Sequence, residues 1–168
     1  DYNPGGKLPV TFYESTKDLP DFLDYSMENR TYRYFRGVPQ YAFGYGLSYT
    51  TFEVGKGKLS KKSMKADGSV KITVPVENTG DREGTETIQV YVKALDYAEA
   101  PIKSLKGFQK INLKAGEKGK VEIVLDGESF QYYDPSIDEL STRTGRYQIL
   151  YGTSSLEKDL KSIDFVVK

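Results

Sequence analysis

Residues 39–52 read PQYAFGYGLSYTTF, and this stretch decides how the chain is organised. Pro39, Gly44 and Gly46 interleave with aromatic rings, so neither a regular helix nor a long central strand is expected there. Each ring can bury on the order of 150–250 Å², and so much aromatic surface must lie against something. We interpret residues 39–52 as an irregular connector held between packed bodies. The alternative is a tyrosine-rich loop that lies on its own domain.

Downstream of the connector, apolar and polar residues alternate with the period of two that is typical of strands. Val70, Ile72, Val74 and Val76 share one face of such a strand, and Pro75 within it predicts an edge or a bulge. The other strands are expected near residues 52–62, 88–92, 105–113, 121–125, 147–151 and 163–167, with a bulge near residues 107–108. About seven strands separated by turns predict a mainly β fold, a fibronectin III or Ig-like β-sandwich over residues 53–168.

Residues 1–52 form an irregular N-terminal part with no sustained period. Lys7–Tyr13 reads as one short strand with Leu8, Val10 and Phe12 on one face, and Pro20 limits residues 15–24 to a helical turn. A second helical turn is expected at residues 127–130. Such a segment buries few apolar residues alone, so it must lie against another body. We expect residues 1–50 either to drape over the sandwich or to pair with a second copy.

Six motifs in order link the chain to a known family. They are YNPGGKLPVTF at 2–12, TYRYFRG at 31–37, the stretch at 39–52, VENTGDREG at 76–84 followed by QVYV at 89–92, LKGFQK at 105–110 and YQILYGTSS at 147–155. Together they resemble the C-terminal region of family 3 glycoside hydrolases, the β-glucosidase and β-xylosidase family. The resemblance implies that residues 1–52 are the tail of an α/β sandwich domain plus the junction, and residues 53–168 a fibronectin type III-like domain.

The resemblance also implies a function. The parent protein would hydrolyse β-glucosyl or β-xylosyl units of plant-type oligosaccharides with retention of the anomeric configuration. The TYRYFRG element favours the xylosidases slightly. The family's catalytic carboxylates lie in preceding domains and their motifs do not occur here, so no catalytic residue is assigned. This chain would be a non-catalytic accessory region whose partners are the N-terminal catalytic domains, in a periplasmic or secreted protein. A second copy, through residues 1–50, is the other candidate partner.

Aromatic side chains are the candidate functional residues. The candidates for packing between domains are Tyr34, Phe35, Tyr41, Phe43, Tyr45, Tyr49 and Phe52, with Tyr32 in the same group. Interleaved glycines favour packing, because they let backbones approach closely. The alternative is a sugar-stacking platform on an independent carbohydrate- or surface-binding module. Outward-facing Tyr91, Tyr132 and Tyr133 would support that alternative.

Composition excludes several classes of chemistry. The chain has neither cysteine nor histidine, which rules out disulfides, Ser-His-Asp and Cys-His catalysis and metal sites built from imidazole or thiolate. Its 24 basic and 24 acidic residues cancel, and the lysines of residues 56–65 read as solvated rather than as a nucleic-acid patch. No apolar run approaches the roughly 18 residues of a membrane span, and no cofactor is expected.

Asp134, Asp138 and Glu139 are the one cluster of carboxylates that resembles a glycosidase pair, which for retention lies about 5–5.5 Å apart. With nothing nearby to desolvate them, they read as a solvated turn. Weak calcium binding by their oxygens is the alternative.

Overall fold

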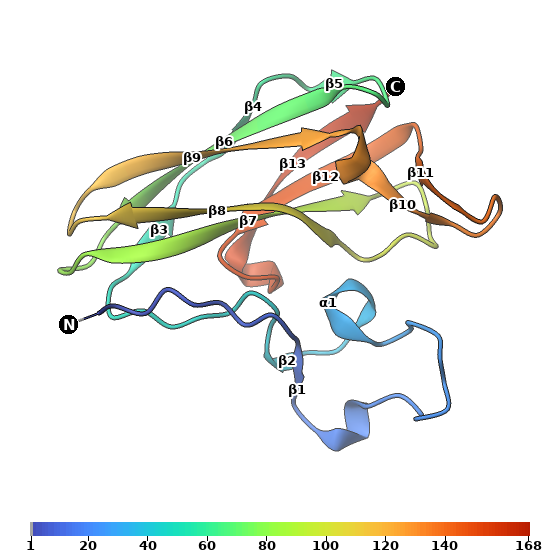
Figure 1. Ribbon diagram of the computed structural model, residues 1–168, viewed down its shortest axis with the longest axis horizontal. Helices are drawn as coiled ribbons and strands as arrows, with labels where there is room; N and C mark the ends of the chain where they lie inside the picture. The colour runs from blue at the N-terminus through green and yellow to red at the C-terminus, as the bar shows by residue number, and fades with distance from the viewer. Residues whose placement is uncertain (1) are drawn as a thin grey trace.

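The structure is a computed structural model that describes residues 2–168, and most of it is a two-layered β-sandwich (Figure 1). One layer is a five-stranded sheet in the order β5-β13-β12-β7-β8, in which only the β5–β13 pair is parallel. Its strands are β5 (Ser63–Met64), β7 (Gly84–Ala94), β8 (Ser104–Leu113), β12 (Gly145–Gly152) and β13 (Leu160–Val167).

The second layer is a sheet built around β6 (Ser69–Asn78). One edge of β6 pairs with β9 (Lys118–Asp126), and the other pairs with β3 (Phe52–Val54) and β4 (Lys58–Leu59). Two smaller hairpins are β1 (Phe12–Tyr13) with β2 (Pro39–Tyr41), and β10 (Gln131–Asp134) with β11 (Glu139–Thr142). The helical pieces are α1 (Thr31–Tyr34) and three 3-10 turns at Thr16–Asp18, Gly127–Phe130 and Glu157–Asp159.

The hydrophobic core lies between the two sheets, where the alternating residues of each strand meet. Val70, Ile72, Val74 and Val76 are at most 2% exposed, and they pack against the inward residues of β7, β12 and β13. All seven expected strand regions lie in these two sheets. The β-sandwich prediction is therefore confirmed, as are the helical turns within residues 15–24 and 127–130.

Pro75 lies inside β6, which pairs with strands on both sides and so is not an edge strand. The Pro75 carbonyl accepts a hydrogen bond from Gly55 N, in the gap between β3 and β4. Because the amide and carbonyl of a strand residue point to the same side, the missing donor of Pro75 faces this interruption. The single strand expected near residues 52–62 is therefore divided into β3 and β4, and the gap between them lies where Pro75 has no backbone N–H to donate. The expected bulge in β8 is present, opposite Val90 and Tyr91.

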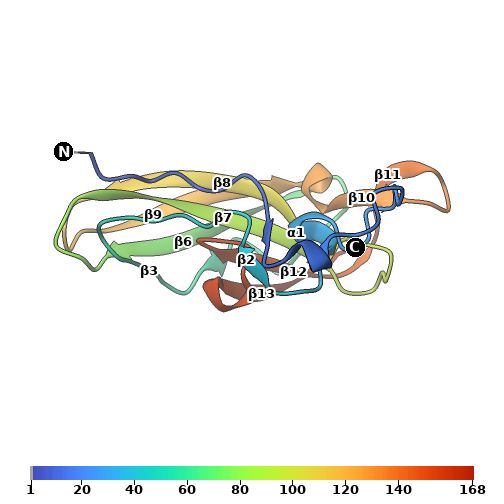
Figure 2. The same cartoon turned by 90° about the horizontal axis from the view of Figure 1, so that it is seen from below.

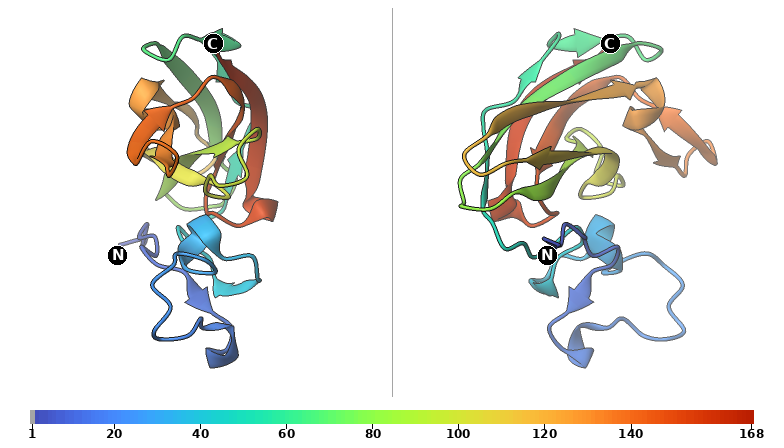
Figure 3. Two further views of the ribbon diagram at one scale, coloured as in Figure 1. Left: turned by 90° about the vertical axis from the view of Figure 1, so that its right-hand side faces the viewer. Right: turned by 60° about the vertical axis from the view of Figure 1, so that its left-hand side comes forward.

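The N-terminal segment, residues 2–51, meets the outer face of the five-stranded sheet through residues 39–51 and α1, while its loop around residues 14–30 extends away from the sheet (Figures 2 and 3). Draping was one of the two expected arrangements. The strand expected at Lys7–Tyr13 was too long, since only Phe12–Tyr13 pairs in β1. Leu8 instead makes one reciprocal pair of backbone hydrogen bonds with Gly44 and Tyr45. A β-ladder needs a continuous partner strand, and no such strand lies beside residues 7–11 in the described part of the chain. No helix in that range is long and apolar enough to cross a bilayer.

Candidate functional site

The candidate site is the contact between residues 39–52, the aromatic junction, and the outer face of β7 and its neighbours. Three backbone hydrogen bonds fix the path of the chain: Leu8 N to Tyr45 O and Gly44 N to Leu8 O, both 2.8 Å, and Ser155 N to Phe43 O, 2.9 Å. The first two tie the junction to the start of the chain. The third ties it to the loop between β12 and β13.

Gln89 is the polar centre of this contact. It is 3% exposed, and its Nε2 donates to the carbonyls of Gly44 at 3.0 Å and Thr153 at 2.7 Å. Its Oε1 accepts a hydrogen bond from the Tyr91 hydroxyl. Gly44 has φ +80°, and a Cβ there would lie 2.0 Å from Gln89 Oε1. The backbone conformation at position 44 favours glycine, and a Cβ there would displace the Gln89 amide from its hydrogen bonds.

Tyr32 of α1 packs over the same place. Its ring stacks on Phe43 with centroids 4.3 Å apart and meets Tyr91 edge-on at 5.7 Å. The Leu105 amide donates to the Tyr32 hydroxyl at 2.9 Å, and Ile102 N donates to the Arg33 carbonyl at 2.8 Å. Burial raises the pKa of Tyr32 and of Tyr91, which moves the ionisation of both phenols further above the physiological range.

The start of the chain is bonded to the far end of the same sheet. Asn3 donates to the Glu83 carbonyl at 2.9 Å and accepts from the Tyr49 amide at 2.9 Å. Lys7 and Glu86 form an ion pair of 2.6 Å whose side chains are 16% and 12% exposed. Because both charges are largely withdrawn from water, removing either one alone would leave the other buried without its partner.

The structure divides the seven packing candidates into groups. Phe43 and Tyr45 are half-buried in the junction, and Tyr45 packs on Tyr41 with centroids 5.5 Å apart. Phe52 packs against the sandwich core. Phe35 meets Tyr13 edge-on at 4.8 Å within the N-terminal segment, where the Arg33 guanidinium lies over the ring of Tyr34. Tyr41 and Tyr49 are 45% and 68% exposed. Whether the exposed rings contact another domain stays a prediction.

The outward aromatic row that would favour a binding module is not present. Tyr91 is 0% exposed and Tyr132 is 5% exposed, while only Tyr133, at 53%, reaches solvent. Tyr91 lies on the outer face of β7 as expected, but the expectation that Tyr91 and Tyr132 reach solvent was wrong. The N-terminal segment covers Tyr91, and Tyr97 packs on Tyr132 with centroids 5.6 Å apart.

The acidic cluster meets its expectation as a solvated turn at Asp138 and Glu139, which are exposed, but not at Asp134. Asp134 is 4% exposed, accepts hydrogen bonds from the Ser136 hydroxyl and amide, and pairs with Arg143 at 3.2 Å. Hydrogen bonds from Ser136 are the main cause that lowers the pKa of Asp134. A carboxyl held ionised is unsuited to be the general acid of a glycosidase. In residues 2–168 no group of three or more acidic side chains is placed to hold a metal ion.

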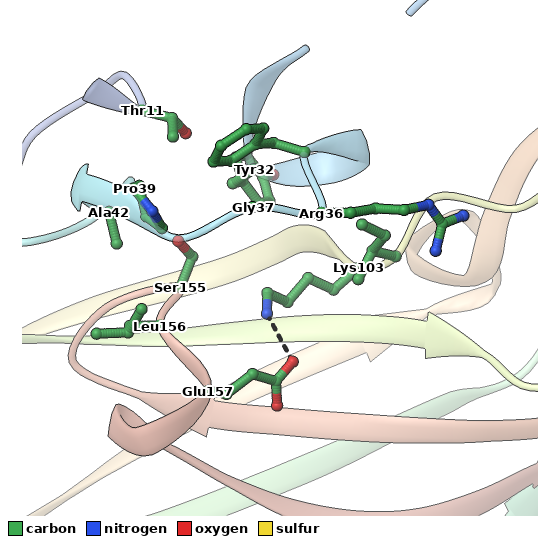
Figure 4. Close-up of a pocket in the computed structure, with 12 residues that line it drawn as sticks. Thr11, Tyr32, Arg36, Gly37, Pro39, Ala42, Lys103, Ser155, Leu156 and Glu157 are labelled. Carbon is green, nitrogen blue, oxygen red and sulfur yellow. Dashed lines mark hydrogen bonds and ion pairs between the residues drawn. The ribbon is translucent and has the colours of Figure 1, made fainter. Parts of the chain in front are cut away.

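A cleft opens where the N-terminal segment meets the sandwich (Figure 4). Its volume is about 280 Å³, and its walls include Tyr32 and Pro39 on one side and Leu156 on the other. Lys103, only 5% exposed, points its ammonium toward Glu157 at 3.1 Å, whereas the Arg36 guanidinium is turned away from it.

Sequence reasoning did not find Gln89 or Lys103. Tyr91 could have indicated that Gln89 is buried. The two residues share one face of the strand, and a large aromatic side chain on an otherwise polar face indicates that another part of the protein covers this face. For Lys103, in a polar loop, the sequence carried no signal of burial.

Two family models match the chain. The glycosyl hydrolase family 3 C-terminal domain matches residues 1–49, and the fibronectin type III-like domain matches residues 86–155. Among curated proteins, a xylan 1,4-beta-xylosidase from Xylanibacter ruminicola is 49% identical over 97% of this chain. A periplasmic beta-glucosidase from Salmonella typhimurium is 38% identical over 92% of it. The chain spans 19% and 22% of the length of these two relatives.

Solved structures agree with these matches. A beta-glucosidase from Kluyveromyces marxianus superposes with a TM-score of 0.82 at 34% identity, over 99% of this chain and 21% of that one. A beta-D-glucoside glucohydrolase from Trichoderma reesei superposes with a TM-score of 0.84 at 26% identity, over 99% of this chain and 27% of that one.

Proposed function

The chain belongs to the family 3 glycoside hydrolases, of which it is the C-terminal region with the fibronectin type III-like domain, and we propose that it is the non-catalytic scaffold of a retaining β-glycosidase. In this proposal residues 1–52 end the catalytic body and residues 53–168 form the scaffold domain. The 49% identity to a protein named a xylosidase and the TYRYFRG element favour a β-xylosyl substrate over a β-glucosyl one. The relative named as periplasmic supports an envelope or secreted location.

The observation that carries this proposal is the two-sidedness of the N-terminal segment. One side is bonded to the sandwich through Gln89, Tyr32 and the Lys7–Glu86 pair. The other side exposes apolar side chains: Val10 at 50%, Phe12 at 46%, Leu23 at 76%, and Phe22 and Tyr25 at 89% each. An exposed apolar surface of this kind marks a contact with another protein surface.

The loop that carries Phe22 and Tyr25 is shaped by its own hydrogen bonds. The Arg30 side chain donates to the carbonyls of Asp24 at 2.6 Å, Asp21 at 3.1 Å and Ser26 at 3.2 Å. A loop ordered in this way does not need to bury its aromatic rings to keep its form. It can present them to a partner with little further loss of conformational entropy.

Hydrogen exchange tests the docking. In the longer protein we expect the amides of residues 21–27 to exchange more slowly than in the 168-residue chain alone, because the catalytic domains exclude water from this loop. Equal exchange in both would contradict docking. Protection in the isolated chain that rises with its concentration would instead indicate that a second copy occupies the surface through residues 1–50.

The isolated chain is expected to have no glycosidase activity. The acidic cluster at residues 134–139 is not suited to the reaction, since Asp134 is bound to Ser136 and Arg143, and Asp138 accepts a hydrogen bond from the Tyr133 hydroxyl. The purified chain should release no 4-nitrophenol from 4-nitrophenyl β-xyloside or β-glucoside above the uncatalysed rate. Release that co-elutes with the chain through two chromatographic steps would overturn the scaffold proposal.

A further inference from the structure

Lys103 is a buried cation whose only hydrogen-bond partner in residues 2–168 is itself in solvent. The side chain of Lys103 is 7% exposed and that of Glu157 is 78% exposed, with 3.1 Å between Nζ and Oε1. An ammonium has three N–H donors, and burying it is costly unless they are paired. Because Glu157 is largely hydrated, its carboxylate can leave the ammonium at small cost. Another carboxylate can therefore take its place.

The surroundings of this ammonium have the form of a small binding site. The cleft of about 280 Å³ lies at the lower end of the range for ligand pockets, which suits a body the size of a single ring. Apolar walls face each other, with Phe35, Pro39 and Ala42 on the N-terminal segment opposite Ile102 and Leu156. The Thr11 hydroxyl, which also lines the cleft, is buried and has no hydrogen-bond partner in residues 2–168.

Charge favours a singly charged anion. Lys103, Arg36 and Glu157 are the charged residues that line the cleft, so its lining is net positive while Arg36 points away from the ammonium (Figure 4). One lysine between apolar walls suits a carboxylate. A phosphate carries more charge and usually requires several converging donors or an arginine fork.

We propose that this cleft binds a small carboxylate carried on a ring-sized body, with the carboxylate on Lys103 Nζ in place of Glu157 and the ring between the apolar walls. The choice of an acidic sugar as the natural source rests on the proposed glycosidase function. The carboxylate site itself rests on Lys103 and the cleft alone.

The test is an NMR titration of the ¹⁵N-labelled 168-residue chain with D-glucuronate, and with D-glucose as the neutral match. Glucuronate on the order of 10 mM should give saturable shifts of the amides of Lys103, Ser155, Leu156 and Glu157, as for a millimolar Kd. D-glucose should bind about tenfold more weakly or not at all, because a hydrogen bond to a charged group is lost. No saturable shift with glucuronate, or equal shifts with glucose, would overturn the proposal.

Variants assign the effect to the ammonium. Lys103→Met should weaken glucuronate binding about tenfold or more. Glu157→Gln keeps an amide oxygen that can accept a hydrogen bond from the ammonium, and it should tighten glucuronate binding about two- to fivefold, because the competing negative charge is removed. Lys158→Met is the matched control, since it changes charge on the same turn and should leave the affinity unchanged. An affinity that is the same in Lys103→Met and Glu157→Gln as in the unchanged chain would overturn the proposal.

Two further ligands distinguish the sources. Acetate should bind more weakly than glucuronate, because it lacks the ring that fills the cleft, and equal affinity would contradict the ring-sized site. Tighter binding of glucuronate than of cyclohexanecarboxylate supports an acidic sugar, while the reverse order supports another cyclic carboxylate. Failure of the glycosidase proposal would appear as inactivity of the longer protein on aryl glycosides, which leaves the carboxylate site standing.

Discussion

Replacing Gln89 by leucine is expected to lower the free energy of unfolding by about 3 kcal/mol or more and to release the aromatic junction from the sheet. The leucine would leave the carbonyls of Gly44 and Thr153 and the Tyr91 hydroxyl without their partner inside the contact. Each buried polar group that loses its hydrogen bond costs about 1–3 kcal/mol. Urea unfolding followed by circular dichroism measures the loss.

Hydrogen exchange shows where the loss occurs. The Ser155 amide donates across the contact to Phe43, and the amides of Leu8 and Gly44 hold the junction to the start of the chain. The protection of these three amides should fall more than that of Ile88 or Val90 in the core strand. Gln148→Leu is the matched control, because Gln148 lies on the outer face of β12, is partly exposed, and within residues 2–168 its side chain bonds only to Asp164. A similar loss of stability in both variants would show that Gln89 holds no special position.

Gly44→Ala tests the same contact from the other side. The added Cβ meets Gln89 Oε1 and also forces alanine into the left-handed region at φ +80°, a strain of about 1–2 kcal/mol. In a Gln89→Ala background the collision disappears and only the strain remains, so the cost of Gly44→Ala should shrink. An unchanged cost would mean that the glycine is needed for its backbone angle alone.

The core-forming half of the fold could be predicted because one face of each strand is buried between two sheets. Residues 70–76 are an example, because apolar and polar side chains alternate along them and the apolar ones identify the buried face. The outer face of β7 could not be predicted in the same way, because Thr87 and Gln89 are polar and read as solvent-facing. Their burial depends on a segment more than 30 residues earlier in the chain, and no local period records that contact.

The candidate site was predictable in its aromatic part and not in its polar part. Glycine and proline among aromatic rings indicate close packing, so Phe43 and its neighbours could be found from residues 39–52 alone. Gln89 and Lys103 are common surface residue types, and only their three-dimensional neighbours make them buried. Lys7–Tyr13 failed for a related reason: its pattern is that of a strand, but a strand exists only where a partner supplies the ladder.

Alkaline pH is expected to unfold the chain steeply through three buried tyrosines, Tyr91, Tyr132 and Tyr147, which are at most 5% exposed. Burial is the main cause that raises the pKa of each, for Tyr132 to about 12. In the unfolded chain a phenol loses its proton near pH 10. The folded state therefore binds more protons above that pH, and its stability is complete below about pH 10 and falls as the pH rises further.

The expected slope is about 1.4 kcal/mol per pH unit for each tyrosine, or about 4 kcal/mol per unit for the three together between roughly pH 10.5 and 11.5. Urea unfolding at several pH values from 9 upward, about half a unit apart, measures it. Tyr132→Phe separates the contribution of one phenol: its hydroxyl is buried without a hydrogen-bond partner in residues 2–168, so its removal should not lower stability at pH 7, while the slope falls by about one third. Tyr25→Phe, at a residue that is 89% exposed, should leave the slope as it was. If Tyr132→Phe and Tyr25→Phe behaved alike, the buried phenols would not be the groups that set the alkaline limit of the fold.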